Sequence, residues 1–289
     1  MTPLVIALVL TSAVIHATWN LWAKQIGGTA RSGPLMWTLT AVSSVLYAPF
    51  ALWIITSTGW RPDGTALLFI VGSGLIHVIY FLLLLRGYSR SDLSLVYPVA
   101  RGTGPLLATA GAIAWMGERP TQLSITGAVC ITAGVLVLTL RPALATDHRL
   151  GAGLRYGLAT GLLIAIYTLW DGWAVKRVLL QPLVFYWGGE VVRVLLFTPA
   201  AITDRAGVVQ LWREHRARVI GIAALSPLSY ILILLALRTG AVSHIAPARE
   251  IAILIGAWLG GHVLGEGERT RRLVAAAAFA VGVIALALS

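Results

Sequence analysis

Charged residues are scarce in this 289-residue chain, at 11% of the sequence, whereas an ordinary soluble domain carries roughly 25%. Hydrophobic residues make up 58% of the chain, and its mean hydropathy is +0.84. So few charges cannot cover a water-soluble globule, and so many apolar residues exclude intrinsic disorder. The composition therefore places the chain in lipid.

Cysteine is nearly absent as well, because Cys130 is the only one. A single cysteine excludes a disulfide-rich secreted scaffold, and its apolar neighbours favour a buried structural thiol. The sequence also lacks sustained heptads, a phosphate-binding glycine loop and a metal-spaced histidine cluster. These absences argue against a coiled coil, an ATP-driven pump and a metal site. We expect no cofactor, no metal and no enzymatic activity.

Apolar runs, by contrast, are long and numerous. About 20 residues cross the hydrocarbon core as a helix. Segments of that length, separated by polar residues, Pro or Gly, lie at 4–23, 34–56, 64–86, 94–116, 122–140, 152–174, 182–202, 217–237, 242–263 and 271–288. We predict an all-α integral membrane protein with ten transmembrane helices. The longest connection lies near 203–216, so any function must lie within the bilayer.

The net charge of +11 arises from basic residues in the connections, where they set orientation, and no nucleic-acid-binding module is visible. One set of connections carries Lys24, Arg31, Arg86, Arg90, Arg141, Arg149, Arg155, Arg205, Arg213, Arg216, Arg218, Arg269, Arg271 and Arg272. The other set carries Arg61, Arg119, Lys176, Arg177 and Arg238. Because cytoplasmic connections are enriched in Lys and Arg, we place the first set in the cytoplasm and both termini outside the bacterial inner membrane.

The second half of the chain repeats the first. The matching segments are Trp19 to Ala23 with Trp170 to Ala174, Pro34-Leu35 with Pro182-Leu183, Leu46 to Pro49 with Leu196 to Pro199, Tyr80 with Tyr230, and Ser94 to Pro98 with Ser243 to Pro247. Arg101 precedes Glu118 by seventeen residues, and Arg249 precedes Glu266 by the same number. We therefore predict two five-helix repeats, 1–141 and 150–289.

An odd number of helices in each repeat turns the second copy upside down in the membrane, as in secondary transporters. Two related packings, each open to one side, then surround a substrate site near the middle of the bilayer. A duplicated structural protein without transport is the alternative. Polar groups at membrane depth are costly, and their number here favours transport.

Each repeat ends in a Gly-Glu pair followed by an apolar helix that carries glycines. These segments are Gly117-Glu118-Arg119 with Gly127 and Gly134-Val135, and Gly265-Glu266 with Gly282-Val283. On these segments the whole chain resembles a drug/metabolite transporter of the ten-helix EamA type. The resemblance implies an export-type or exchange carrier for amino acids, other metabolites or drugs, with a central cavity lined by helices 1, 3, 4, 6, 8 and 9. It names no substrate, and this chain lacks the basic N-terminus of many members.

Arg101, Arg193 and Arg249 lie within predicted membrane helices. An unpaired charge there costs about 2.5–3.5 kcal/mol on insertion scales, so these side chains should face the bundle interior. Arg101 and Arg249 hold equivalent places in the repeats, so we expect them on opposite sides of one cavity, binding a carboxylate, phosphate or phosphonate. For Arg193 we favour an ion pair with Glu190, which lies three residues earlier on the same helix face. Ion pairing is the alternative for the other two, with Glu250 for Arg249 and another helix for Arg101.

Two acidic residues also lie at or near membrane depth. Glu190 is the candidate for proton coupling, because a carboxylate in a low dielectric can exchange a proton near physiological pH. Pairing with Arg193 would instead keep Glu190 ionised and inert. Asp171, near the end of the sixth predicted helix, is expected to cap or orient a neighbour.

Aromatic and polar side chains share helix faces at three- and four-residue spacing. The candidates for substrate binding are His16, Trp19, Asn20, His77, Tyr80, Tyr97, Arg101, Tyr167, Trp170 and Arg249. An aromatic-walled cavity with a few polar groups is typical of a small-molecule site. Such walls suit flat or aromatic substrates, and they also suit cations.

The remaining residues of interest are assigned a structural role: Glu118, Glu266, Gly127, Gly134, Pro98 and Pro247. The two glycines allow close helix packing. Pro98, Pro105 and Pro247 are expected to interrupt the fourth and ninth helices, either as gating hinges or as simple kinks.

The sequence favours a monomeric secondary transporter for a small zwitterionic or anionic metabolite such as an amino acid, and the resemblance favours export. A proton-coupled exporter of hydrophobic or cationic drugs is the first alternative, in which Glu190 would be essential and Arg101 dispensable. An integral-membrane enzyme acting on lipids is the second. His16, His77 and His244 form no metal-spaced cluster, however, and no nucleophile lies at motif spacing from a base.

Overall fold

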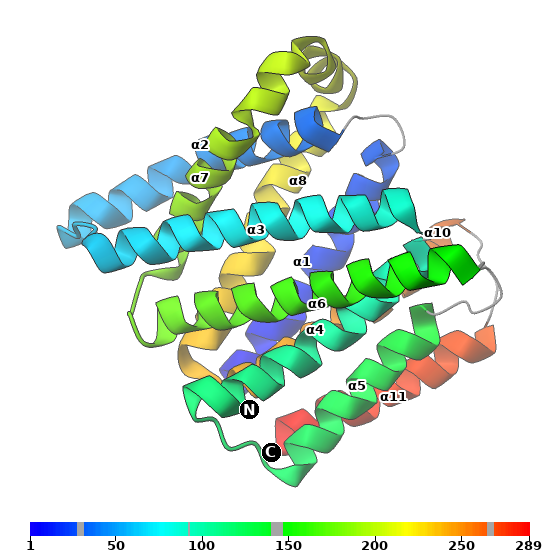
Figure 1. Ribbon diagram of the computed structural model, residues 1–289. Helices are drawn as coiled ribbons and strands as arrows, with labels where there is room; N and C mark the ends of the chain where they lie inside the picture. Colours follow the sequence, from blue (N-terminus) through cyan, green and yellow to red (C-terminus); the bar gives the residue numbers. More distant parts are fainter. Residues whose placement is uncertain (28–31, 92, 140–146, 265–268) are drawn as a thin grey trace.

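The computed structural model describes residues 1–27, 32–91, 93–139, 147–264 and 269–289 (Figure 1). These residues form helices and no strands: α1 Pro3–Gly27, α2 Ser32–Thr58, α3 Gly64–Arg90, α4 Leu93–Met116, α5 Gln122–Thr139, α6 Asp147–Lys176, α7 Pro182–Thr203, α8 Arg205–Thr239, α9 Val242–Ala248, α10 Ile251–Leu264 and α11 Arg269–Leu288. The predicted all-α fold class is therefore confirmed.

The helices coincide with the predicted segments, with two differences. The segment expected at 242–263 is divided into α9 and α10 at Arg249 and Glu250. Helix α8 begins at Arg205, within the stretch expected as the longest connection, and it bends at His215, whose φ of −131° is not helical.

The number of membrane crossings remains a prediction. Eight segments of the described residues are long and apolar enough to cross a membrane. Helix α4 is not among them, and α11 contributes only a shorter apolar stretch, Leu273–Leu288.

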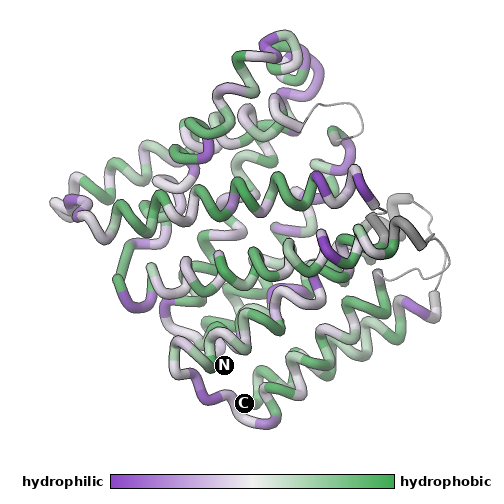
Figure 2. The backbone as a smooth tube through the Cα atoms, viewed as in Figure 1, coloured by the Kyte–Doolittle hydropathy of each residue, from purple (hydrophilic) through white to green (hydrophobic). Residues whose placement is uncertain are grey.

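The outer surface of the bundle is apolar and its interior holds charges, the reverse of a soluble protein. Val45, Trp53 and Leu195 are 73%, 68% and 67% exposed, whereas Arg101 and Glu250 are 8% and 1% exposed. Figure 2 shows the hydrophobic colour along the helices and the hydrophilic colour mainly near their ends. Exposed apolar surface of this extent needs lipid to cover it. The chain is a multi-pass membrane protein.

Two pairs of helices from opposite halves of the chain pack antiparallel. In the α2–α7 pair, the Trp37 indole donates to the Thr198 hydroxyl at 3.1 Å, and the Trp187 indole donates to the Ser44 carbonyl at 3.0 Å. Residue numbers therefore increase in opposite directions along the two helices. The second and seventh helices would be equivalent in the two predicted repeats.

The α5–α11 pair is antiparallel as well, and it depends on glycine. A Cβ on Gly127 would lie 2.8 Å from the carbonyl oxygen of Gly282, and one on Gly134 would lie 2.9 Å from the Phe279 ring. Both glycines thus lie at a close helix contact, in agreement with their predicted role.

Two further sets of contacts between the halves come in matched pairs. Helix α1 packs on α8 as α3 packs on α6, and α2 packs on α8 as α3 packs on α7. The two termini meet at one end of the bundle, where the Met1 ammonium donates to the Leu286 and Ala287 carbonyls at 3.4 and 3.2 Å (Figure 1). Termini on the same side require an even number of crossings.

Candidate functional site

A cavity of about 440 Å³ lies between the two halves of the chain. Nine of the ten predicted substrate-binding residues line it: His16, Trp19, Asn20, His77, Tyr80, Tyr97, Arg101, Tyr167 and Arg249. Residues not singled out for the site from the sequence complete the wall, among them Thr40, Ser43, Tyr186, Ser226, Ser229 and Tyr230. The helices bring together residues up to 233 positions apart, from His16 to Arg249.

The cavity reaches toward one end of the bundle. Its lining extends to Ala23 and Tyr88, close to the final residues of α1 and α3. At the other end Val5 and Val9 of α1 are buried in a core that includes Leu237 and Ile245. The cavity is therefore closed at the end where the termini meet.

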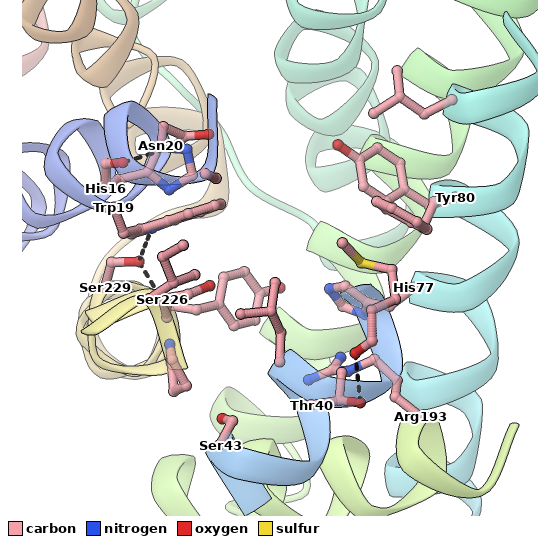
Figure 3. Close-up of a pocket in the computed structure, with 18 of the residues that line it drawn as sticks. His16, Trp19, Asn20, Thr40, Ser43, His77, Tyr80, Arg193, Ser226 and Ser229 are labelled. Atoms are coloured by element: carbon pink, nitrogen blue, oxygen red, sulfur yellow. Dashed lines mark hydrogen bonds between the residues drawn. The ribbon is translucent and has the colours of Figure 1, made fainter. Parts of the chain in front are cut away.

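Helix α1 supplies one wall through residues that share a face. The His16 and Trp19 rings meet edge to face with their centroids 4.9 Å apart. The Trp19 indole donates to the Ser229 hydroxyl of α8 at 3.3 Å, and the Asn20 amide donates to the His16 carbonyl at 2.8 Å. Figure 3 shows these three residues across the cavity from His77 and Tyr80.

Rings from α3, α6 and α8 form the facing wall. His77 stacks on Tyr167 with centroids 4.5 Å apart and planes inclined by 30°. Tyr80 and Tyr230 meet the same Tyr167 ring at 5.6 and 6.3 Å. Stacked rings in fixed orientation suit a flat or aromatic substrate.

A buried carboxylate joins two of the arginines. Glu250 Oε2 lies 3.1 Å from Arg101 Nε, and Glu250 Oε1 lies 3.9 Å from Arg249 Nε. The expectation that Arg101 and Arg249 lie on opposite sides of the cavity is therefore wrong, because both contact one side chain. Arg101 instead pairs with Glu250 from a distant part of the chain, which agrees with the alternative of pairing across helices.

The Arg249 guanidinium also forms hydrogen bonds with neutral side chains. It donates to the Tyr167 hydroxyl at 2.8 Å and, at 3.5 Å, to Thr168 Oγ1. Arg101 and Arg249 thus share one carboxylate within ion-pair distance, and an anionic group can supply a second hydrogen-bond acceptor to Arg249.

The break between α9 and α10 places Arg249 and Glu250 at the cavity. Pro247 has no amide hydrogen, so the Ser243 carbonyl loses its helical donor, and the Thr109 hydroxyl of α4 lies 3.5 Å from it. The backbone then tightens, because the Glu250 amide donates to the Pro247 carbonyl three residues back, at 3.0 Å. The predicted interruption of the ninth helix is present.

Helix α4 behaves differently from the prediction. It runs from Leu93 to Met116 through both Pro98 and Pro105, so Pro98 does not interrupt it. Its continuous backbone carries Tyr97 one turn before Arg101, and the Arg101 guanidinium lies 5.8 Å from the centre of the Tyr97 ring. This contact helps to hold the buried arginine in place.

Glu190 and Arg193 form a closed ion pair on α7. Arg193 Nη2 lies 2.8 Å from Glu190 Oε1, and the Tyr186 hydroxyl donates to the same oxygen at 2.5 Å. The Arg193 guanidinium also lies 5.1 Å from the centre of the Tyr186 ring. The geometry matches the alternative in which Glu190 is paired, and not that of a free proton-coupling carboxylate.

Asp171 is completely buried behind the cavity wall. The Tyr230 hydroxyl donates to its Oδ2 at 2.6 Å, and His77 Nε2 lies 4.0 Å from the same atom. Both partners line the cavity, but Asp171 does not. The expected orienting role fits its contact with Tyr230.

Trp170, by contrast, does not line the cavity. Its indole donates to the Phe69 carbonyl of α3 at 2.9 Å and stacks near the Phe69 ring at 4.6 Å. From its place in the repeat, Trp170 was expected to line the cavity as the counterpart of Trp19. Instead, its side chain packs at the contact between α3 and α6.

Glu118 connects the end of α4 to the start of α9. Gly117 adopts a φ of +71°, which ends α4 and turns the chain. Glu118 then accepts hydrogen bonds from the Val242 and Ser243 amides at 2.8 and 2.9 Å. A carboxylate on the first amides of a helix stabilises that helix, so the predicted structural role has a clear form. Glu266 lies outside the described residues.

The aromatic partners Tyr186 and Tyr230 were missed from the sequence as site residues. Tyr186 lies four residues before Glu190, and this helical spacing could have identified it. Tyr230 was visible only as the repeat partner of Tyr80. The bridging role of Glu250 has no local sequence signal, because its first partner, Arg101, lies 149 positions away.

The amino-terminal half of the chain matches a known family, the EamA-like transporters, over residues 3–140. No curated protein matches the chain. A solved structure described as "Crystal structure of protein" superimposes with a TM-score of 0.77 at 16% identity, covering 98% of both chains. At that identity the likeness shows the fold alone.

Proposed function

We propose that this protein is a secondary transporter that moves a small zwitterionic or anionic metabolite, such as an amino acid, across the bacterial inner membrane by alternating access. The observation that carries the proposal is an aromatic-walled cavity of about 440 Å³ with three arginines, inside a bundle whose outer surface is apolar. Charged side chains at membrane depth are costly, and in membrane proteins they commonly mark the pathway of a substrate or an ion.

Alternating access requires two related packings, and the helix contacts support an inverted repeat. The α2–α7 and α5–α11 pairs join equivalent helices and are antiparallel. The family match ends at residue 140, next to the boundary proposed for the first repeat at 141. Two inverted units can exchange their packings and so expose one cavity to each side in turn.

The orientation proposed from the Lys and Arg counts makes this state open to the cytoplasm. The cavity extends toward the ends of α1 and α3, near the connections assigned to the cytoplasm, and is closed at the end of the termini. A metabolite entering from the cytoplasm would load this state for efflux.

The charges favour a substrate with a carboxylate. Arg249 offers nitrogen atoms bound only to the neutral Tyr167 and Thr168 hydroxyls, while the carboxylate that lines the cavity, Glu190, is paired with Arg193. A cationic drug would meet three guanidinium groups and no unpaired carboxylate among the described lining residues. We therefore favour a metabolite over a cationic drug.

Transport by the purified protein in liposomes tests this proposal. Three labelled compounds that share a phenyl ring separate the recognised groups: L-phenylalanine, 3-phenylpropionate without the amine, and phenethylamine without the carboxylate. We expect uptake of the first two above that of empty liposomes, and none of the third. Uptake of phenethylamine alone would support the drug exporter, and no uptake of any compound would contradict the assignment to this substrate class.

A further inference from the structure

Three carboxylates are buried at the cavity, and only two of them contact arginine. Glu190 lies 2.8 Å from Arg193, and Glu250 lies 3.1 Å from Arg101. Asp171 contacts the hydroxyl of Tyr230 and faces His77, and no arginine or lysine of the described chain lies within ion-pair distance of it. A buried carboxylate with only neutral partners is costly to hold in its charged form.

The orientation of His77 makes the pair an acceptor for one proton. His77 Nδ1 lies 2.8 Å from the Ser73 carbonyl, which can only accept, so Nδ1 carries the hydrogen. In the neutral ring Nε2 is then a bare acceptor, and it faces Asp171 Oδ2 at 4.0 Å. One proton on either atom would turn this contact into a hydrogen bond after an approach of about 1 Å.

We propose that Asp171 and His77 together form the site that binds one coupling proton during transport. His77 and Tyr230 line the cavity, and Asp171 lies directly behind them. Water in the cavity supplies the proton to His77 Nε2 or Asp171 Oδ2, and the same atoms return it when the cavity opens to the other side. No other bond forms or breaks.

Polar and charged side chains from several helices surround the Asp171–His77 pair. Helix α3 contributes Ser73 and His77, α6 contributes Tyr167, and α8 contributes Tyr230. At longer range, Arg193 on α7 and Arg249 at the α9–α10 break add positive charge. Glu190 and Glu250 partly neutralise these arginines, and Arg101 of α4 is held by Glu250.

A chain of contacts joins the proton to the substrate. His77 stacks on Tyr167, and the Tyr167 hydroxyl accepts from Arg249. With Asp171 charged, the three arginines are balanced by three carboxylates; with a proton on the pair, one positive charge is in excess. A substrate carboxylate then binds more tightly, and by linkage the substrate raises the affinity for the proton. Proton and substrate thus cross together, so efflux through this state runs down an outward gradient of the substrate and carries a proton out with it.

This inference rests on the proposed function, and the two can fail separately. Uptake of L-phenylalanine at equal pH on both sides tests transport itself. The inference is tested by the same liposomes with one pH unit across the membrane and the membrane potential held at zero. Coupling to one proton predicts accumulation on the alkaline side up to about tenfold, since one pH unit corresponds to a tenfold ratio.

Asp171→Asn removes the proton acceptor and is the first variant. We expect it to lose the accumulation driven by the pH gradient. Exchange at equal pH measures the transporters that remain active, and the accumulation is compared per active transporter. Asp63→Asn makes the same chemical change at the start of α3, outside the cavity, where Asn caps as well as Asp. It should accumulate substrate as the wild type does.

A second variant and a wild-type measurement cover the case in which Asp171→Asn does not fold. His77→Gln should also lose the response to the pH gradient. In the unaltered protein, a pH indicator trapped in the liposomes should report acidification when L-phenylalanine is added outside. Transport of L-phenylalanine without acidification, accumulation on the acidic side, or a gradient response lost in Glu190→Gln but kept in Asp171→Asn would overturn the proposal.

Discussion

Helix α4 and the α9–α10 pair occupy matching places in the two proposed repeats, yet one is continuous and the other is broken. Helix α4 passes through Pro98 and Pro105, whereas α9 ends directly after Pro247. Proline alone therefore does not decide where a helix breaks. At the break, two charged residues, Arg249 and Glu250, are adjacent in sequence.

The difference has a geometric reason. Neighbouring residues on a helix point about 100° apart, so a continuous α9–α10 helix could not direct both Arg249 and Glu250 toward the same cluster as easily. The tightened backbone at the break lets Glu250 contact Arg101 while Arg249 reaches Tyr167. One repeat thus supplies a single arginine on a continuous helix, and the other supplies an arginine and a carboxylate at a break between two helices.

The carboxylate at the break carries the largest expected effect. Glu250→Gln leaves Arg101 and Arg249 buried without a counter-charge, which should lower the free energy of unfolding by about 3–5 kcal/mol. Unfolding in detergent micelles measures the loss. Glu214→Gln, at the half-exposed partner of His215 on α8, is the matched control and should be close to wild type. Equal stability of the two variants would show that Glu250 does not hold the arginine cluster together.

The two arginines of the cluster should differ in transport. Arg249 offers its outer nitrogens to the cavity, whereas Arg101 is held by Glu250. Losing a charged hydrogen bond costs about 1.5–3 kcal/mol, so Arg249→Gln should lower kcat/KM for 3-phenylpropionate by about ten- to a hundredfold. Arg101→Gln should lower it less, and Arg61→Gln, in an exposed connection, should not lower it. A larger loss in Arg101→Gln than in Arg249→Gln would reverse the assignment.

The proline at the break should matter more than those in α4. Pro247→Ala restores an amide that can donate to the Ser243 carbonyl, which favours one continuous helix and should slow the exchange between packings. We expect a several-fold lower maximal transport rate with nearly unchanged KM. Pro105→Ala is the comparison in the unbroken helix, and equal slowing of transport by both variants would remove the special role of the break.

The cap that joins the two helices should give the smallest effect. Glu118→Gln keeps one acceptor oxygen for the Val242 and Ser243 amides and loses the charge, which should cost about 1 kcal/mol of stability. Thermal unfolding of the purified variant measures this cost. A loss as large as that of Glu250→Gln would mean that Glu118 does more than cap α9.

Local pattern predicted the helices and the inward direction of the buried charges. Arg193 and Glu190 share a helix, so their spacing was enough to predict their pairing, and the start and end of most helices followed the apolar runs. The joint contact of Arg101 and Arg249 with Glu250 could not be predicted, because it depends on how distant helices pack. Trp170 was misplaced for the same reason, since repeat position says nothing about the neighbouring Phe69.

The central claim is that two antiparallel five-helix units enclose the cavity, and side-specific labelling tests it most directly. In a Cys130→Ala background, single cysteines replace the exposed Pro62, between α2 and α3, and the exposed Ala206, at the start of α8. A membrane-impermeant maleimide should label Pro62→Cys in intact cells and Ala206→Cys only after the membrane is opened. Labelling of both positions from the same side would contradict the inverted arrangement.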